Sequence, residues 1–124
     1  MTEEDSTLIE LNVGGVYYKT TKKTLLQERD SYFNQIINNS SKSFTYENYN
    51  NKKHTIFKLF IDRNGDLFKY ILDYLRNNKK LILPDNFKDF KRLQAEAKFY
   101  KLTDLEMILD EMIELNCSKT TGEK

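Results

Sequence analysis

Cysteine, proline, histidine and tryptophan are scarce in this chain of 124 residues, which has one cysteine, one proline, one histidine and no tryptophan. Because Cys117 is the only cysteine, no disulfide can form within the chain. No apolar run approaches the roughly 20 residues that a membrane-spanning helix needs. The first seven residues are polar and acidic, unlike a secretory signal. These absences predict a cytoplasmic or nuclear protein without direct membrane insertion.

An excess of charge of one sign is also missing. Twenty Lys and Arg residues nearly balance nineteen Asp and Glu residues, which gives a formal net charge of +1. Such a chain has no strong field to attract nucleic acid, so nucleic acid is not an expected partner. The length is typical of one domain. We expect this domain at residues 8–116, between a disordered N-terminus at 1–7 and a flexible tail at 117–124.

The first half of the chain predicts strands followed by short helices. Residues 8–21 are β-prone on both sides of Gly14-Gly15, which is typical of a hairpin. Capping residues and apolar spacing predict short helices at 22–28 and from Ser31 onward. Residues 38–53 are rich in Asn, Ser and Lys, and this composition predicts a flexible surface loop.

The stretch from Phe57 to Asn77 organises the rest of the chain. It begins as a short strand, turns through Asp62-Arg63-Asn64-Gly65, and continues as a helix that Asn64 or Asp66 can cap. On a helical wheel, the apolar and tyrosine positions cover a wider arc than contact with one core requires. Two interpretations follow: a central core helix, or a helix with a second surface for another protein.

The remaining residues predict two more helices. Leu81–Leu83 precede the single proline, Pro84, and form either a short strand or an extended linker. Asp85 or Asn86 is predicted to cap the next helix, and Thr103 the last one. The fold class is therefore α+β, with a small sheet, made of the N-terminal hairpin and a central strand, packed with about five α-helices.

Several blocks of this sequence occur in the order, and near the spacing, of a known family. They are Leu11–Gly15, Tyr18–Thr21 with Thr24-Leu25, Ser31–Phe33, Phe60–Gly65 with Phe68, Ile71, Leu72, Tyr74, Leu75 and Arg76, Leu83-Pro84 with Phe87, and Leu93–Tyr100. Together they resemble the BTB/POZ domain of the potassium-channel tetramerisation type. The resemblance implies the BTB/POZ fold and a module that self-associates into closed rings, either homo-tetramers or homo-pentamers.

The resemblance also implies where copies meet, because in the family the charged turn and the start of the following helix lie at or near the contact. The residues that this carries over are Asp62, Arg63, Asn64, Asp66 and Phe68, followed by Tyr74, Arg76 and Tyr100. Arg63 is expected to donate to a carboxylate or backbone carbonyl of the neighbouring copy. For each residue, the alternative is capping or core packing within one copy.

The function implied by the resemblance is protein interaction. Relatives of this type suggest the assembly domain of a soluble adaptor that recruits a cullin-type ubiquitin ligase. The alternative is a cytoplasmic assembly domain of a potassium channel, or of another oligomer, with no cullin contact. The candidate partner-binding residues are aromatic, because exposed aromatic side chains are good anchors: Phe44, Tyr46, Tyr49, Phe87 and Phe90.

Neither a metal nor another cofactor is expected. The channel branch of the family often holds zinc between copies through one His and several Cys, and this chain offers only His54 and Cys117. Those two residues also lack the nucleophile and base arrangement that covalent catalysis needs. The sequence therefore predicts an interaction domain and not an enzyme.

Overall fold

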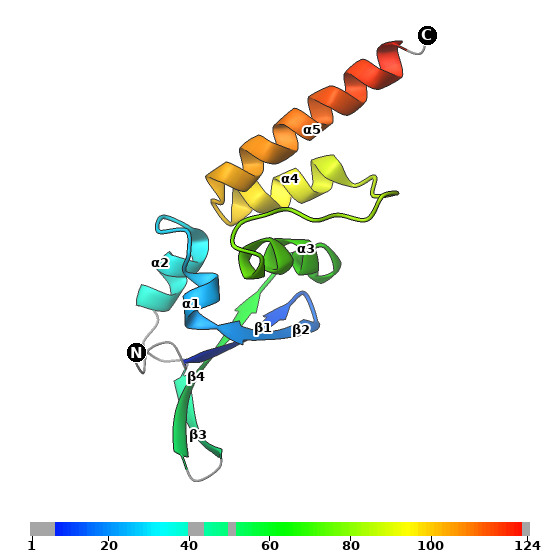
Figure 1. Cartoon of the computed structure of the whole chain (residues 1–124). Coiled ribbons are helices and arrows are strands. Elements are labelled where there is room, and N and C mark those ends of the chain that lie inside the picture. Colours follow the sequence, from blue (N-terminus) through cyan, green and yellow to red (C-terminus); the bar gives the residue numbers. More distant parts are fainter. Residues whose placement is uncertain (1–6, 40–43, 50–51, 123–124) are drawn as a thin grey trace.

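The structure is a computed structural model that describes residues 7–39, 44–49 and 52–122 (Figure 1). In this part of the chain there are four strands and five helices. In chain order they are β1 (Leu8–Val13), β2 (Val16–Thr21), α1 (Lys22–Leu25), α2 (Tyr32–Asn39), β3 (Phe44–Tyr49), β4 (Lys52–Ile61), α3 (Gly65–Arg76), α4 (Phe90–Phe99) and α5 (Thr103–Gly122). The predicted α+β class, with a hairpin, a central strand and five helices, is confirmed.

The four strands form one mixed sheet in the order β2-β1-β4-β3. β1 pairs antiparallel with β2 and parallel with β4, from Leu8 opposite Ile56 to Val13 opposite Ile61. β4 is longer than β1, so its first residues, Lys52–Thr55, pair only with β3. Figure 1 shows this β3–β4 hairpin extending away from the helices.

One prediction about the sheet is wrong. Residues 38–53 are not a loop throughout, because β3 and the start of β4 lie within them, while residues 40–43 and 50–51 lie outside the described part. Aromatic and Thr residues recur in the segment Phe44–Tyr49, and such residues favour strands. The prediction rested on the loop-like composition of residues 38–53. The pairing of β3 with β4 outweighs that composition.

α3 is the central helix of the fold. This is the first of the two interpretations of its wide apolar arc, a central core helix. Seven of its twelve residues are buried. In Figure 1 it lies between the sheet on one side and α4 on the other, with α5 beyond α4. Ile9, Leu11 and Val13 on β1 alternate toward this side of the sheet and are buried in the same core.

Aromatic rings fill the middle of the core. The rings of Phe33 and Tyr100 are stacked with their centroids 4.9 Å apart, and both pack edge-on against Phe68. Tyr18 packs edge-on against the other side of this group, 5.1 Å from Phe68. Because these residues come from β2, α2, α3 and the end of α4, the cluster joins most of the fold.

Local signals set the helix ends. The Asn64 side chain caps α3 by accepting a hydrogen bond from the Leu67 N–H at 3.0 Å. At its other end, Lys79 N–H bonds to the Tyr74 carbonyl and Asn78 N–H to the Leu75 carbonyl, with Asn78 in the left-handed region at φ 57°. This pattern is a Schellman motif, in which Asn is a common substitute for Gly.

Leu81–Leu83 belong to a linker, which is one of the two alternatives predicted for them. Two predicted boundaries differ from those observed. α4 begins at Phe90 after Asp89, later than the predicted caps at Asp85 or Asn86. α5 runs as far as Gly122, and so continues the helix through residues for which the sequence predicts a tail.

Candidate self-association surface

The turn Asp62–Gly65 is held against the β1–β2 turn by contact between backbones. Gly14 N–H donates to the Ile61 carbonyl at 2.9 Å, and Arg63 N–H donates to the same carbonyl at 3.0 Å. A Cβ atom on Gly14 would lie 2.2 Å from the Arg63 carbonyl oxygen, and one on Gly65 would lie 2.1 Å from the Val13 carbonyl oxygen. Two glycines are therefore needed to bring these turns together, which positions the charged turn at the end of the sheet.

Within the charged turn, Arg63 contacts its own chain. Its Nε and Nη2 atoms donate to the two carboxylate oxygens of Glu96 on α4, at 3.0 and 2.9 Å. The guanidinium also lies over the Phe99 ring, 4.5 Å from the centroid. Glu96 is buried, with 7% of its surface exposed. Arg63 donates two hydrogen bonds to one carboxylate, as expected of an arginine. The carboxylate, however, belongs to the same copy and not to a neighbouring copy.

The other predicted interface residues divide into buried and exposed groups. Phe68, Tyr74 and Tyr100 are buried in the core, which favours core packing for these three. Asn64 caps α3 with its side chain. Three residues remain exposed on the surface: Asp62, Asp66 and Arg76.

Arg76 covers part of a sheet edge. Its Nη2 atom donates to the Lys19 carbonyl at 2.6 Å, from the end of α3 to the edge strand β2. A strand at the edge of a sheet exposes backbone groups that can pair with another chain. The Arg76 bond therefore makes the Lys19 carbonyl at this edge less available for pairing with another chain.

We call the side of the sheet opposite the core the outer sheet face. Asn12 lies opposite Tyr17 on β2 and opposite Phe60 on β4, so these three residues form one row across the sheet. Tyr17 is 77% exposed and Phe60 is 63% exposed. Tyr17 and Phe60 lie on the two strands that flank β1, so their Cα atoms are roughly 10 Å apart. Two large aromatic residues on one open face mark a candidate contact surface.

A row of charges lies next to this aromatic row. Glu10 is opposite Lys19 on β2 and opposite Lys58 on β4. Lys19 Nζ and a Glu10 carboxylate oxygen are 3.3 Å apart. The outer sheet face thus combines exposed aromatic rings with charges of both signs. The sequence analysis did not identify this face. It could have done so, because successive side chains of a strand point to opposite faces, so the residues that alternate with Ile9, Leu11 and Val13 face away from the core.

The predicted partner-binding aromatic residues lie in two places. Phe87 and Phe90 are partly buried and line an open groove with Ile113 of α5. Tyr70, Phe87 and Phe90 form a chain of edge-to-face rings, with centroids 5.0 and 5.1 Å apart. Three others, Phe44, Tyr46 and Tyr49, lie on β3, where the side chains are outside the described part.

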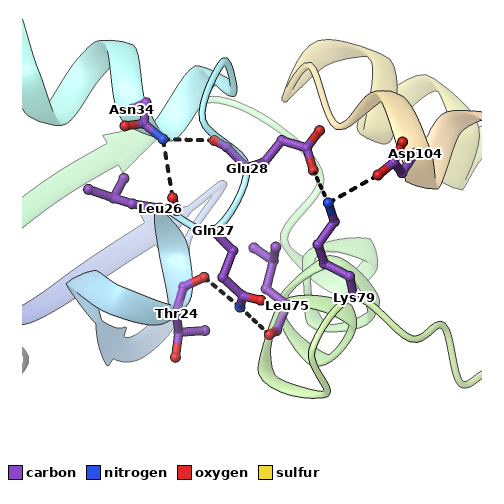
Figure 2. A network of polar contacts seen from close by, with 8 residues as sticks. All are labelled: Thr24, Leu26, Gln27, Glu28, Asn34, Leu75, Lys79 and Asp104. Atoms are coloured by element: carbon purple, nitrogen blue, oxygen red, sulfur yellow. Dashed lines mark hydrogen bonds and ion pairs between the residues drawn. The ribbon is translucent and has the colours of Figure 1, made fainter.

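Figure 2 shows a polar network that connects the segment around α1 with α2, α3 and α5. Lys79 Nζ lies 3.0 Å from carboxylate oxygens of both Glu28 and Asp104, which joins the segment after α1 to the end of α3 and the start of α5. These bonds, to Asp104 and then Glu28, raise the pKa of Lys79. The Gln27 amide bonds to the carbonyl groups of Thr24 and Leu75. The network is structural in character.

Two further properties concern what the described part of the chain can do. No group of three or more His, Cys, Asp and Glu residues placed to hold a metal occurs there. None of its helices is both long enough and apolar enough to cross a membrane. His54 and Cys117 have side chains outside this part, so the predicted absence of zinc stays a prediction.

The comparisons with known proteins agree with this fold. The BTB/POZ domain family matches residues 9–109. The chain is 38% identical to the potassium channel regulatory proteins of Bos taurus over 104 residues, Homo sapiens over 103 and Mus musculus over 106. These matches cover 84%, 83% and 86% of this chain, and 36%, 35% and 37% of the relatives.

The chain belongs to the BTB/POZ domain family, in the branch of the potassium-channel tetramerisation type. Such a domain serves protein interaction and assembly. The chain spans a little over a third of the length of the relatives that it matches.

Proposed function

We propose that this chain is a homo-oligomerising interaction module whose copies meet through the outer sheet face. The observation that supports this proposal is the row of Tyr17, Asn12 and Phe60, with two exposed aromatic rings on a sheet face opposite the core. Aromatic residues are enriched where proteins meet, and they dominate the binding energy there. Burial of this row in an assembly removes from water both aromatic side chains among the exposed large hydrophobic residues of the described surface.

A closed ring fits this surface better than a symmetric pair. The outer sheet face carries Lys58 beside its aromatic row, while the charged turn and the start of α3 present the exposed carboxylates of Asp62 and Asp66. In a ring, one face of each copy meets a different face of the next copy. We propose that the outer sheet face of one copy meets the charged turn of its neighbour, in a tetramer or a pentamer.

The test compares two variants by light scattering at micromolar concentration. In the first variant, Tyr17 and Phe60 are both replaced by Ser. In the second, Ser replaces Ile82, which is equally exposed, at 63%, but lies on the linker between α3 and α4. We expect the wild type and Ile82→Ser to form rings larger than dimers, and the double variant to be smaller. A monomeric wild type would contradict the proposal.

Two roles of a longer parent protein can build on such a ring. One is recruitment of a cullin-type ubiquitin ligase, for which the partly buried Phe87 and Phe90 are candidate contacts. Calorimetric titration with a purified cullin N-terminal domain tests this role, and a flat titration would remove it.

The second role is regulation of a potassium channel, and the name shared by the relatives favours it. A domain of the channel tetramerisation type can act on a channel by joining the channel's own assembly domains in a mixed ring. Light scattering of this chain mixed with a purified channel tetramerisation domain tests this role. Separate homo-oligomers after mixing and refolding would argue against it.

A further inference from the structure

The groove beside α4 is apolar on its floor and basic on its rim. Its floor is formed by Phe87, Phe90 and Ile113, and its volume is about 490 Å³. Lys88, Lys91 and Arg92 lie on the rim and are exposed. With Asp89 as the only acidic residue in the lining, the groove carries a formal charge of +2 (three basic residues and one acidic residue). The charge of the whole chain is only +1, so this imbalance is local.

The start of α4 adds to the positive potential of this groove. Asp89 occupies the N-cap position, but its side chain makes no capping hydrogen bond to α4. Its carboxylate lies 3.8 Å from Arg92, which leaves the first backbone N–H groups of the helix without a side-chain acceptor. The positive end of the helix dipole therefore adds to the basic rim. An occupant of the groove should combine apolar side chains with carboxylates.

The exposed side of α5 has that chemistry. At about 100° per residue, Glu111 and Glu114 lie on the side of the helix opposite the buried Leu105 and Leu109, and Leu115 lies about 40° from Glu111. Leu115 is 68% exposed. Glu111 and Glu114 are exposed and make no ion pair with any described residue. Figure 1 shows α5 continuing past α4.

We propose that α5 of a second copy occupies the groove, with Leu115 on the apolar floor and Glu111 and Glu114 against Lys88 and Lys91. The basic residues at the rim and the acidic residues on α5 are both exposed, and neither Lys has an ion-pair partner in the described part of the chain. Ile113 lines the groove and lies within one helical turn of Glu114 and Leu115. The groove and the exposed side of α5 are therefore adjacent on each copy. Two copies can therefore exchange them reciprocally, each groove receiving the partner's helix.

This contact uses a different part of the surface from the outer sheet face. None of the groove residues lies on β1, β2 or β4. The α5 contact therefore joins two copies whether or not a ring forms, and joins two rings where rings form. Its success or failure in an experiment is separable from that of the proposed ring.

Reciprocal charge reversal tests the proposal by sedimentation of the full chain. The groove variant carries Lys88→Glu and Lys91→Glu, and the helix variant carries Glu111→Lys and Glu114→Lys. In a mixed pair, both grooves again face a helix of opposite charge. A control variant with Lys23→Glu and Arg29→Glu reverses two exposed charges in and just after α1.

We expect each charge variant alone to self-associate about tenfold more weakly than the wild type, because each reversed pair changes from attraction to repulsion. An equimolar mixture of the two should regain the wild-type association, and salt at about 1 M should reduce it. The same pattern should persist in chains that carry Tyr17→Ser and Phe60→Ser, where the ring contact is removed.

Three outcomes would overturn the proposal. The first is wild-type association of either charge variant. The second is equal weakening by the Lys23→Glu and Arg29→Glu control, which would assign the effect to net charge. The third is weakening in both variants without recovery in the mixture, which would mean that the groove charges and the α5 charges do not face each other. Circular dichroism of each variant confirms that the fold is retained.

Discussion

Arg63 and Glu96 form a two-bond ion pair that joins the charged turn to α4 across 33 residues of sequence. Arg63 is partly exposed, while Glu96 is buried. The Phe99 ring lies against the guanidinium and shields it further from water. The geometry of the charged turn therefore depends on a contact within the subunit, even if its exposed carboxylates serve a contact between subunits.

Replacing Arg63 with Ala should destabilise the fold by about 1–3 kcal/mol, because it leaves the buried Glu96 carboxylate without its partner. This loss in the free energy of unfolding is smaller than the loss expected for a fully buried ion pair, because Arg63 is partly exposed. Urea unfolding measures the change. Arg92→Ala is the matched control, since Arg92 is exposed and lies 3.8 Å from its acidic neighbour. Equal stability of Arg63→Ala and the wild type would contradict this interpretation of the pair.

Replacing Gly65 with Ala should destabilise the fold by about 2–4 kcal/mol, since the added Cβ would lie 2.1 Å from the Val13 carbonyl oxygen and the backbone would have to move. Gly15→Ala is the comparison that separates backbone strain from a steric clash of the added Cβ. Gly15 has φ +99°, but a Cβ added there would meet no atom within 4 Å, so only backbone strain of about 1–2 kcal/mol is expected. Thermal unfolding of both variants gives the comparison, and a smaller loss at Gly65 than at Gly15 would refute the proposed close approach.

Replacing Lys101 with Gly should stabilise the fold by about 0.5–1 kcal/mol. Lys101 follows α4 at φ 59°, with Leu102 N–H bonded to the Ala97 carbonyl in a Schellman motif. Glycine adopts this conformation without steric cost, and it is the residue most often found there. Lys98→Gly, inside the same helix, should instead destabilise by about 1 kcal/mol. Chemical denaturation of the two variants should therefore give changes of opposite sign.

Local patterns were sufficient to predict most of the fold. Gly14-Gly15 predicted the hairpin, Asn64 predicted the start of α3, and the apolar arc of α3 predicted a central helix as one of two interpretations. Each of these signals depends on residues a few positions apart. The β3–β4 hairpin was missed because its strands are defined by pairing with one another, while the composition of the segment resembled a loop.

The candidate surface was less predictable than the fold. The partner of Arg63 lies 33 residues away, and sequence spacing alone cannot place Glu96 beside it. The burial of Tyr74 and Tyr100 likewise results from packing among several elements. Tyr17 and Phe60 could have been identified, because strand alternation puts them on the side opposite the buried residues, but this requires the pairing of β1 with both of its neighbours.

Replacing Tyr100 with Phe should make stability less sensitive to alkaline pH. Burial, followed by the nearby Glu96 carboxylate, raises the pKa of Tyr100 above its usual value of about 10. Above that pH the unfolded chain loses the phenolic proton while the folded protein keeps it. The free energy of unfolding therefore falls as pH rises through this range, and Phe removes the contribution of Tyr100.

At neutral pH the same substitution should leave stability unchanged or increase it by up to about 1 kcal/mol, because the buried hydroxyl has no hydrogen-bond partner in the described part of the chain. Urea unfolding from pH 7 to 11 measures both effects. A Tyr100→Phe protein that loses stability with the wild-type slope would show that the Tyr100 hydroxyl is ionised equally in the folded and unfolded chains.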